Sequence, residues 1–478
     1  MTSGGETLDL RGRDALFDAL SATTFDVAVI GGGITGAGVA RDAAMRGLSV
    51  ALIEAEDFAA GTSSRSSKMI HGGLRYLPMG DVALVREAAS ERRIVQAIAP
   101  HLARETPFVI PARNAAAIAR LRAGLWAFEK LGAVPKNRKH EVWSLAQLLE
   151  REPAIAADDL GGAVAYPEYL TDDARLTLAN VMSAAAHGAL CLNHARVSSI
   201  RIEGGRAVGL EVTETLPGQA RTARLTARLI VNAAGPWVDA LRALEAPGAP
   251  ARLKLSKGVH LVVDRERLPV ERTVIFPAAD RRSVFAVPKG RATYLGTTDT
   301  FYPDAEPWPA ITTEDADYLL TAANQRFSTP ALRHDDVTSA WSGVRPLVGE
   351  EGKSASEISR RDELWTGPAG VLSIAGGKLT AYRKMAERVV DRLEQALGRK
   401  GAPCRTAEEP LAGGDLDVAA MRRDLQAGGL SALDADRLVG LYGSDAPAVA
   451  AEGGDVAAEA RRAVRSEGAL TLEDYWVR

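Results

Sequence analysis

Apolar and polar positions form blocks along the first part of the chain, and the blocks have the lengths of regular elements. Residues 26–30 form a short, mainly apolar run, as is typical of a parallel strand buried on both faces. A glycine-rich turn follows, then a helical pattern as far as Met45, and residues 48–54 predict a second strand. The pattern predicts a βαβ unit of about 30 residues.

The remaining sequence predicts strands and helices in mixed order, so the expected fold class is α/β. Residues 82–150 have a mostly helical pattern, residues 379–397 predict a long helix, and residues 1–24 predict an N-terminal extension with one short helix. Residues 405–478 almost lack β-branched runs, which predicts a small helical domain. Strands are expected at residues 196–202, 207–213, 225–231, 261–263, 284–287, 294–296 and 370–374.

Composition excludes several classes of protein. The 478 residues correspond to roughly three domain-sized units, and 46% of them are hydrophobic, which argues against a disordered chain. The 58 basic and 61 acidic residues give a net charge of −3, so the overall charge gives no reason to expect nucleic-acid binding. Two cysteines, Cys191 and Cys404, cannot build a disulfide framework or a cysteine zinc site, and no metal site is predicted. Signal-peptide and membrane-spanning patterns are missing, so a cytoplasmic location is expected.

A glycine fingerprint joins the first predicted strand to the first predicted helix. Gly31, Gly33 and Gly36 complete the pattern G-x-G-x-x-G, in which the glycines allow a tight turn, a close approach to a pyrophosphate, and close packing of helix on strand. The helix start offers N–H groups and a positive dipole to phosphates. Glu54, at the end of the second strand, is placed to accept hydrogen bonds from an adenosine ribose. The fingerprint predicts a dinucleotide site without separating FAD from NAD.

Three further segments favour FAD. Two later strands end in small-residue turns: one turn contains Ala233 and Gly235, and the other leads through Gly377 and Lys378 into a helix whose positive end would stabilise an anionic reduced flavin. Taken singly, each turn has an alternative interpretation as an ordinary strand-to-helix connection. The third segment is a loop with hydroxyls and cations for pyrophosphate and ribityl oxygens, or alternatively a solvated, capping-rich loop. Its candidate residues are Thr62, Ser63, Ser64, Ser67 and Lys68.

A family resemblance becomes plain at residues 31–77, which read GGGITGAGVARDAAMRGLSVALIEAEDFAAGTSSRSSKMIHGGLRYL. This segment closely resembles the start of FAD-dependent glycerol-3-phosphate dehydrogenases. Further matches follow in the order of that family over about residues 25–400. They are TDDARLTLAN at 171–180, NAAGPWVD at 232–239, KGVHLVV at 257–263, GTTDT at 296–300, SGVRPLVG at 342–349 and AGGKLTAYRKMAE at 375–387.

The resemblance implies an architecture and an activity. A Rossmann-like FAD-binding domain over residues 25–400 would be interleaved with a β-sheet substrate domain, or cap, at roughly 82–170 and 255–345. The implied reaction oxidises sn-glycerol 3-phosphate to dihydroxyacetone phosphate by hydride transfer from C2 to flavin N5, with a quinone as the electron acceptor. The residues that the resemblance adds to the expected FAD site are His71, Gly73, Val197, Leu379 and Thr380.

The resemblance also points to the substrate site. Three arginines are expected there, because planar guanidinium forks suit phosphate: Arg75, Arg345 and Arg360, with Arg361 in place of Arg360 if the register slips by one. Tyr76 and Lys378 are expected beside them. His260 is the preferred base for the C2 hydroxyl proton, and His71 is expected to contact flavin or orient Arg75. For either histidine, a purely structural role is an equal alternative.

Several functional alternatives stay open from the sequence. An oxidase would use oxygen as acceptor, a related dehydrogenase would use another polyol phosphate such as erythritol phosphate, and a non-catalytic FAD-binding sensor would need none of the expected arginines and histidines. The resemblance further implies a homodimer and peripheral contact with the inner face of the cytoplasmic membrane. Residues 121–139, with Leu125, Trp126 and Phe128 among basic side chains, are a candidate for that contact; helix packing is the alternative.

Overall fold

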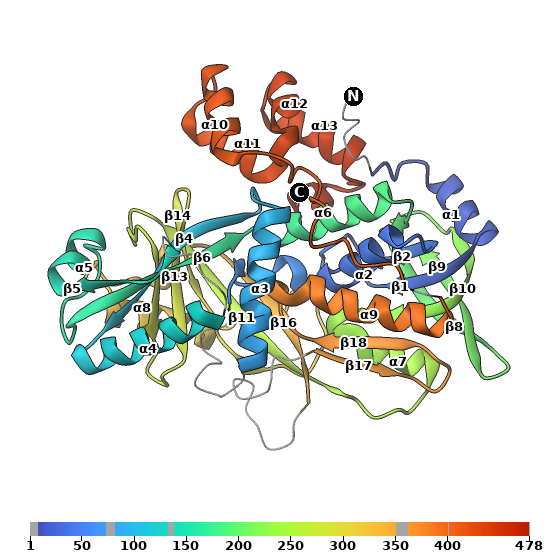
Figure 1. The fold of residues 1–478 in the computed structure, drawn as a ribbon, viewed down its shortest axis with the longest axis horizontal. Coiled ribbons are helices and arrows are strands. Elements are labelled where there is room, and N and C mark those ends of the chain that lie inside the picture. Colours follow the sequence, from blue (N-terminus) through green and yellow to red (C-terminus); the bar gives the residue numbers. More distant parts are fainter. Residues whose placement is uncertain (1–7, 73–81, 132–137, 350–361, 400, 478) are drawn as a thin grey trace.

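The structure is a computed structural model that describes residues 8–72, 82–131, 138–349, 362–399 and 401–477. Two sheets and the helices that cover them form most of the molecule, and a cluster of short helices from the C-terminal part of the chain lies above them (Figure 1). The mixed α/β class expected from the sequence is confirmed.

The first sheet contains the βαβ unit. Its central strands run in the order β18, β10, β1, β2 and β7 and are parallel, while β17 and the pair β8 and β9 add antiparallel edges. The expected strands at 26–30 and 48–54 are therefore present as neighbours. The strands of this sheet are β1 (Thr24–Ile30), β2 (Val50–Ile53), β7 (Leu190–Leu192), β8 (Ala195–Glu203), β9 (Arg206–Glu214), β10 (Thr222–Asn232), β17 (Asp362–Thr366) and β18 (Leu372–Gly376).

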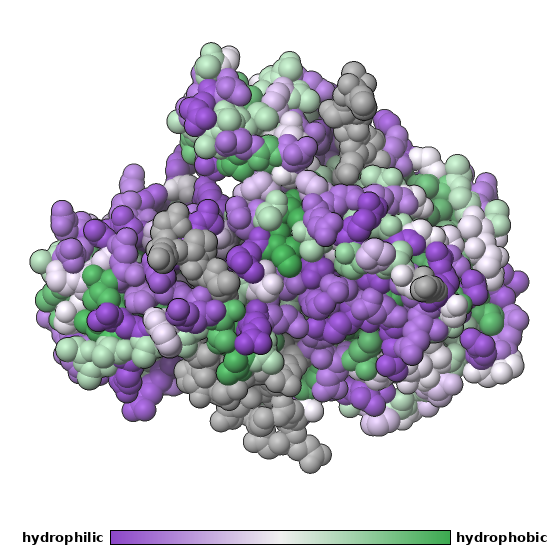
Figure 2. All heavy atoms as spheres, viewed as in Figure 1, coloured by the Kyte–Doolittle hydropathy of each residue, from purple (hydrophilic) through white to green (hydrophobic). Residues whose placement is uncertain are grey.

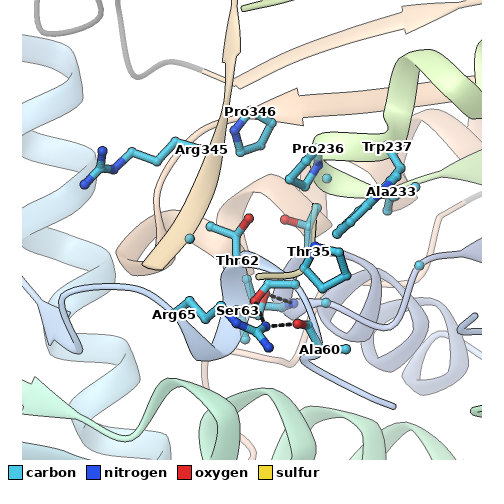
Figure 3. Close-up of a pocket in the computed structure, with 18 of the residues that line it drawn as sticks. Thr35, Ala60, Thr62, Ser63, Arg65, Ala233, Pro236, Trp237, Arg345 and Pro346 are labelled. Carbon is cyan, nitrogen blue, oxygen red and sulfur yellow. Dashed lines mark hydrogen bonds between the residues drawn. The ribbon is translucent and has the colours of Figure 1, made fainter. Parts of the chain in front are cut away.

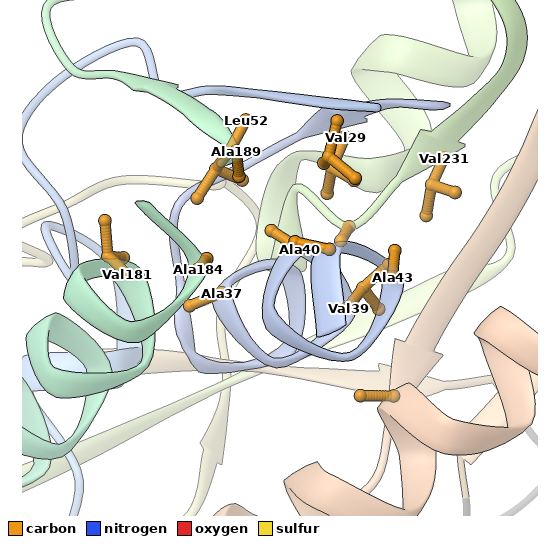
Figure 4. Packing of buried hydrophobic residues seen from close by; sticks show 14 of the residues in the cluster. Val29, Ala37, Val39, Ala40, Ala43, Leu52, Val181, Ala184, Ala189 and Val231 are labelled. Carbon is orange, nitrogen blue, oxygen red and sulfur yellow. The ribbon is translucent and has the colours of Figure 1, made fainter. Parts of the chain in front are cut away.

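Helices cover both faces of the first sheet. Helices α2 (Ile34–Met45), α6 (Asp173–Ala186) and α9 (Tyr382–Ala396) pack together on one face, whereas α1 (Arg13–Ala22) and α7 (Val238–Glu245) lie on the other. Alanines of α2 allow this close packing, because Ala37, Ala40 and Ala43 are fully buried against strand residues such as Val29 and Leu52 (Figure 4).

The second sheet lies beside the first and also carries helices on both faces. Its strands follow the order β15, β11, β14, β13, β12, β4, β6 and β3, with β16 paired to β11 and β5 paired to β6. Helices α5 (Leu145–Arg151) and α8 (Thr313–Arg326) pack on one face and α4 (Ala115–Leu131) on the other, while α3 (Val82–Ile98) lies near α4 and α9. The strands are β3 (Met69–Ile70), β4 (Ala103–Ala112), β5 (Glu141–Ser144), β6 (Gly162–Thr171), β11 (Leu253–Asp264), β12 (Thr273–Pro277), β13 (Ser283–Lys289), β14 (Ala292–Gly296), β15 (Thr300–Phe301) and β16 (Val337–Val348).

The mostly helical prediction for residues 82–150 is wrong at two places. Strand β4 occupies ten residues of this region and pairs with β6 along its whole length, and β5 adds four more strand residues. Pro107 and Pro111 make β4 hard to predict from the sequence, because proline is normally depleted from strands. The first half of β4 is also polar and largely exposed. Pairing with the buried strand β6 determines that residues 103–112 are extended.

Within residues 121–131 and 138–139, the described part of the stretch 121–139, two of the three large apolar side chains named above are buried. Leu125 and Phe128 lie on the buried face of α4, which favours the alternative of helix packing, and only Trp126 of the three is exposed. On the face shown in Figure 2, hydrophobic side chains are scattered among hydrophilic ones. Among the described residues, no helix is long and apolar enough to cross a membrane.

Ion pairs attach the C-terminal helices to the first sheet. Arg175 of α6 makes two hydrogen bonds to the buried carboxylate of Glu467, at 2.7 and 3.1 Å, and His194, which follows β7, lies 3.0 Å from both carboxylate oxygens of Asp474. The helices are α10 (Val418–Ala427), α11 (Ala432–Tyr442), α12 (Ala446–Ala451), α13 (Val456–Ser466) and α14 (Leu472–Val477). Short 3₁₀ turns occupy residues 62–64, 235–237, 334–336, 379–381 and 443–445.

The His194–Asp474 pair should make stability depend on pH. Burial opposes the charged imidazole, but the hydrogen bond and charge of Asp474 outweigh it and raise the pKa of His194 above 6.5. A raised folded-state pKa means that the stabilisation is complete below about pH 6.5 and is lost as pH rises through the folded value. Asp474→Asn should therefore lower the Tm more at about pH 6 than at about pH 9, as measured by calorimetry.

An exposed pair provides the control for that experiment. His334 and Asp317 lie 2.7 Å apart, with side chains 50% and 61% exposed, so Asp317→Asn should change the Tm little at either pH. Equal losses for Asp474→Asn at both pH values would contradict the expectation.

Candidate functional site

A cavity of about 880 Å³ lies between the two sheets, at the upper end of the size range of small-molecule sites. The carboxyl ends of β1, β2 and β10 open into it, and β16 and β18 provide further walls. Thr35, Ala60 and Ser63 lie on the side of the first sheet, whereas Arg345 and Pro346 extend from β16 (Figure 3). Parallel sheets commonly bind ligands at this edge.

The glycine fingerprint has the close contacts that its sequence predicts. Gly31 has a φ of +105°, and a Cβ atom on Gly36 would lie 1.9 Å from the carbonyl oxygen of Gly31, so only glycine lets α2 start against β1. Gly33 and Thr35 line the cavity at the start of α2. Ser63 Oγ accepts a hydrogen bond from Ile34 N at 2.9 Å and fixes the neighbouring loop to this helix start.

Glu54 lies where an adenosine ribose was expected. Its carboxylate lines the cavity, and its oxygens accept hydrogen bonds from Gly32 N at 2.7 Å and Glu56 N at 2.8 Å. Burial raises the pKa of Glu54 above its ordinary value despite these bonds. Each oxygen keeps a second lone pair, so the carboxylate can still accept a hydroxyl hydrogen bond.

Gly36→Ala tests the fingerprint directly. The added methyl group must displace the Gly31 backbone or the start of α2, so we expect the purified variant to retain less than about a tenth of the flavin bound by the wild type. The measurement is the ratio of flavin absorbance to protein absorbance. Gly124→Ala is the control, because this α4 glycine has open space around it and alanine favours helix. Full flavin content in Gly36→Ala would contradict the expectation.

The structure divides the other predicted FAD residues into two groups. Gly36, Ser64, Lys68 and Thr380 do not line the cavity but support residues that do: Thr380 Oγ1 accepts from His71 N, and Lys68 Nζ pairs with Asp173 at 2.6 Å. Burial opposes the charge of Lys68, but Asp173 and Asp172 raise its pKa. Those that line the cavity, besides Gly31, Gly33, Glu54 and Ser63, are Thr62, Ser67, His71, Val197, Ala233, Gly235, Gly377, Lys378 and Leu379.

Arg345 is the predicted substrate residue that the structure places in the cavity most clearly. Its Nη2 donates to Thr297 Oγ1 at 3.0 Å, and its Nη1 lies 3.2 Å from Asp299 Oδ1. The guanidinium lies over Gly258, where a Cβ atom would approach Nη2 to 2.2 Å. Lys378 and His71 line the same cavity. Gly73, Arg75, Tyr76, Arg360 and Arg361 lie outside the described residues.

His260 is close to the cavity but does not line it. The side chain is 1% exposed and stacks on Trp341 with ring centroids 4.6 Å apart, and its Nε2 lies 2.9 Å from Ser67 Oγ. Burial, together with the charges of Arg345 and Lys68, lowers the pKa of His260 far below its ordinary value. The imidazole is therefore neutral and reaches the cavity through Ser67.

Two residues near the site, Arg65 and Trp308, were not among the site residues predicted from the sequence. Arg65 lines the cavity, and burial lowers its pKa to about 10, so it keeps its charge at neutral pH. Its guanidinium lies 3.5 Å from the ring centroid of Trp308, which belongs to the exposed loop after β15. Arg65 stands within the hydroxyl-rich loop, which could have suggested it; Trp308 belongs to none of the motifs.

This geometry fits a dinucleotide. The cavity offers the carboxylate of Glu54 to an adenosine ribose, a helix start that only glycines permit to a pyrophosphate, and the cations Arg345 and Lys378 to a charged reaction partner.

Comparisons with known proteins agree with a dinucleotide-binding site. Residues 26–383 match the model of the FAD dependent oxidoreductase family. The aerobic glycerol-3-phosphate dehydrogenase of Bacillus subtilis is 40% identical, with 98% of this chain and 88% of that protein aligned, and the enzyme of the same name from Staphylococcus haemolyticus is 41% identical over 91% and 80%. The crystal structure of glycerol-3-phosphate dehydrogenase from Bacillus halodurans, complexed with FAD, superposes with a TM-score of 0.81 at 38% identity and covers 98% of this chain and 88% of its own.

The fold and the site therefore define an FAD-dependent oxidoreductase. Within that class, the chain belongs to the family of the aerobic glycerol-3-phosphate dehydrogenases.

Proposed function

We propose that the protein oxidises sn-glycerol 3-phosphate to dihydroxyacetone phosphate and passes the electrons to a quinone. The observation that carries the proposal is one cavity that has the dinucleotide-binding turn in one wall and Arg345 in another. The names of relatives about 40% identical over most of the chain support the substrate, and the resemblance of the sequence supports a quinone acceptor.

Arg345 is suited to bind the substrate phosphate. Thr297, Thr298 and Asp299 hold its two terminal nitrogens, so little side-chain entropy remains to be lost when an anion binds. Glycine at position 258 leaves room for the guanidinium above β11. Lys378 adds a second cation to the cavity wall, and the predicted roles of Arg75, Tyr76 and Arg360 stay proposals.

The residues that would hold FAD lie along the other walls. The start of α2 would face the pyrophosphate, Glu54 and Val197 the adenosine, and Gly377 with the 3₁₀ turn at 379–381 the flavin. Bound FAD supplies the hydride acceptor, N5. The protein contributes a fixed arrangement in which substrate phosphate and flavin are held by opposite sheets.

The visible spectrum under anaerobic conditions tests the proposal. Adding sn-glycerol 3-phosphate to the purified holoprotein should bleach the flavin band, and adding a quinone should restore it. Restoration by air alone, at the rate of turnover, would instead support an oxidase. If only another polyol phosphate bleached the flavin, that compound would be assigned as the substrate. If no polyol phosphate bleached it, the result would support the FAD-binding sensor.

Arg345→Ala should slow substrate-driven flavin reduction by about 100-fold or more, because it removes two charge-assisted hydrogen bonds worth about 1.5–3 kcal/mol each. The rate constant is measured by stopped-flow at subsaturating substrate, and the flavin content should stay at the wild-type level. Arg224→Ala is the matched control, since that side chain is 78% exposed and lies on the edge pair β9–β10. Unchanged reduction in Arg345→Ala would refute its role in phosphate binding.

Membrane contact and a homodimer remain predictions from the family resemblance. The quinone is the part of the proposal that would require such contact, because quinones partition into membranes. Sedimentation with vesicles of anionic and zwitterionic lipid, with Trp126→Ala as one variant, tests whether the exposed indole of α4 takes part.

A further inference from the structure

Three side chains from the second sheet hold two consecutive serines of the loop at residues 61–68. Tyr294 Oη donates to the carbonyl of Ser67 at 3.0 Å, Trp341 Nε1 donates to the carbonyl of Ser66 at 3.2 Å, and His260 Nε2 bonds to Ser67 Oγ at 2.9 Å. These three side chains come from β14, β16 and β11, which pair around His260. Ser67 lines the cavity, whereas His260, Tyr294 and Trp341 do not.

The ring of His260 has one permitted position. It is stacked on Trp341 with an interplanar angle of 9° and meets Tyr294 edge-on at 6.3 Å. On the opposite side lies Gly296, where a Cβ atom would come within 2.0 Å of the ring. Because the ring cannot turn toward the cavity without breaking this packing, any effect of His260 on a bound molecule must pass through Ser67.

Burial and surrounding charge together keep the imidazole of His260 neutral. Its charged neighbours are Arg345 on β16 and Lys68 on the loop, and both are cations that oppose a third positive charge. A neutral imidazole carries its proton on one nitrogen only. The position of that proton decides whether Ser67 receives a hydrogen bond from His260 or gives one to it.

Burial favours the proton on Nε2. Nδ1 is sealed from solvent, and within the described parts of the chain no hydrogen-bonding group reaches it. An orphaned buried N–H donor costs the full desolvation penalty and is rarer in proteins than an under-used acceptor. With the proton on Nε2, that nitrogen donates to Ser67 Oγ, and the hydroxyl hydrogen of Ser67 is left to point into the cavity.

We propose that Ser67 is a hydrogen-bond donor to the molecule bound in the cavity, and that His260 is the positioning residue that sets this polarity. This inference rests on the proposed function, and it gives His260 a role other than the base expected from the sequence. The acceptor is an electron-rich heteroatom, either on the flavin or at the C2 oxygen of the substrate, whose lone pairs can accept a hydrogen bond. The nearby cations Arg345 and Lys68 favour the same kind of group.

Substitutions of Ser67 and His260 distinguish hydrogen-bond donation by Ser67 from base catalysis by His260. Ser67→Ala should slow substrate-driven flavin reduction by about 10- to 100-fold, the worth of one hydrogen bond to a charge-bearing atom. His260→Leu should do the same. His260→Gln can place an amide N–H near the position of Nε2 and should recover the rate to within about fivefold of the wild type, with an unchanged pH profile. His334→Gln, on an exposed histidine paired with Asp317, is the control.

A second measurement does not depend on turnover. In protein labelled with ¹⁵N-histidine, the His260 signals should show a neutral ring protonated on Nε2 with no titration across the neutral range. The signals of His334, an exposed histidine paired with Asp317, provide an internal reference. Ser67→Ala distinguishes the two acceptors: a changed flavin spectrum or reduction potential without substrate assigns the bond to the flavin, and a change confined to substrate-driven reduction assigns it to the substrate.

Four results would overturn the inference. They are a proton on Nδ1, an imidazolium that titrates near neutrality, a His260→Gln variant as slow as His260→Leu with loss of the acid-side limb of the pH profile, and a Ser67→Ala variant that matches the wild type in spectrum and rate. The last two are read only in preparations with wild-type flavin content. If the wild-type flavin is not bleached by any polyol phosphate, the proposed function fails, whereas the tautomer of His260 and the flavin spectrum of Ser67→Ala still test the hydrogen bond.

Discussion

The site depends on the hydroxyl-rich loop at residues 61–68, because both sheets hold it at once. Toward the first sheet, Ser63 caps the start of α2 and Lys68 pairs with Asp173. Toward the second, Thr62 Oγ1 donates to the carbonyl of Val344, and Ser67 bonds to His260. A polar loop without a core of its own thus acquires one defined conformation through its hydrogen bonds. The cofactor walls and the substrate walls can keep their spacing only while this loop joins them.

The βαβ unit could be predicted from the sequence because its determinants are local. Backbone contact between Gly31 and Gly36 needs glycine, and buried parallel strands leave apolar runs that are easily recognised. Positions with buried polar residues were harder to interpret. Strand β11 was expected only at 261–263 but spans Leu253–Asp264, because Lys257 forms an ion pair with Asp315 and His260 is buried against aromatic side chains. Neither partner is visible from the strand itself.

The candidate site shows the same division. The motifs predicted most of the residues that line the cavity, because the strand ends of a parallel sheet meet at one edge. The position of His260 outside the cavity could not be predicted from the motifs. It depends on the stacking of Trp341 across the strand pair β11–β16 and on the space left by Gly296. Arg65 with Trp308 is another pairing of distant segments that no single-sequence pattern encodes. Motifs identify which residues matter, and packing decides what each one contacts.

The strand order of the first sheet has a consequence for how the chain folds. Strands β1 and β2 lie within residues 24–53, but their sheet needs β10 at 222–232 and β18 at 372–376 before it is complete. The glycine turn is therefore synthesised early, and the strands β10 and β18 that complete its sheet are synthesised more than 150 residues later. Such long-range pairing is slow and leaves strand edges exposed in the meantime. FAD can be held firmly only by the finished sheet, so its capture belongs among the last steps of maturation, and chaperone protection of the nascent βαβ unit would favour a good yield.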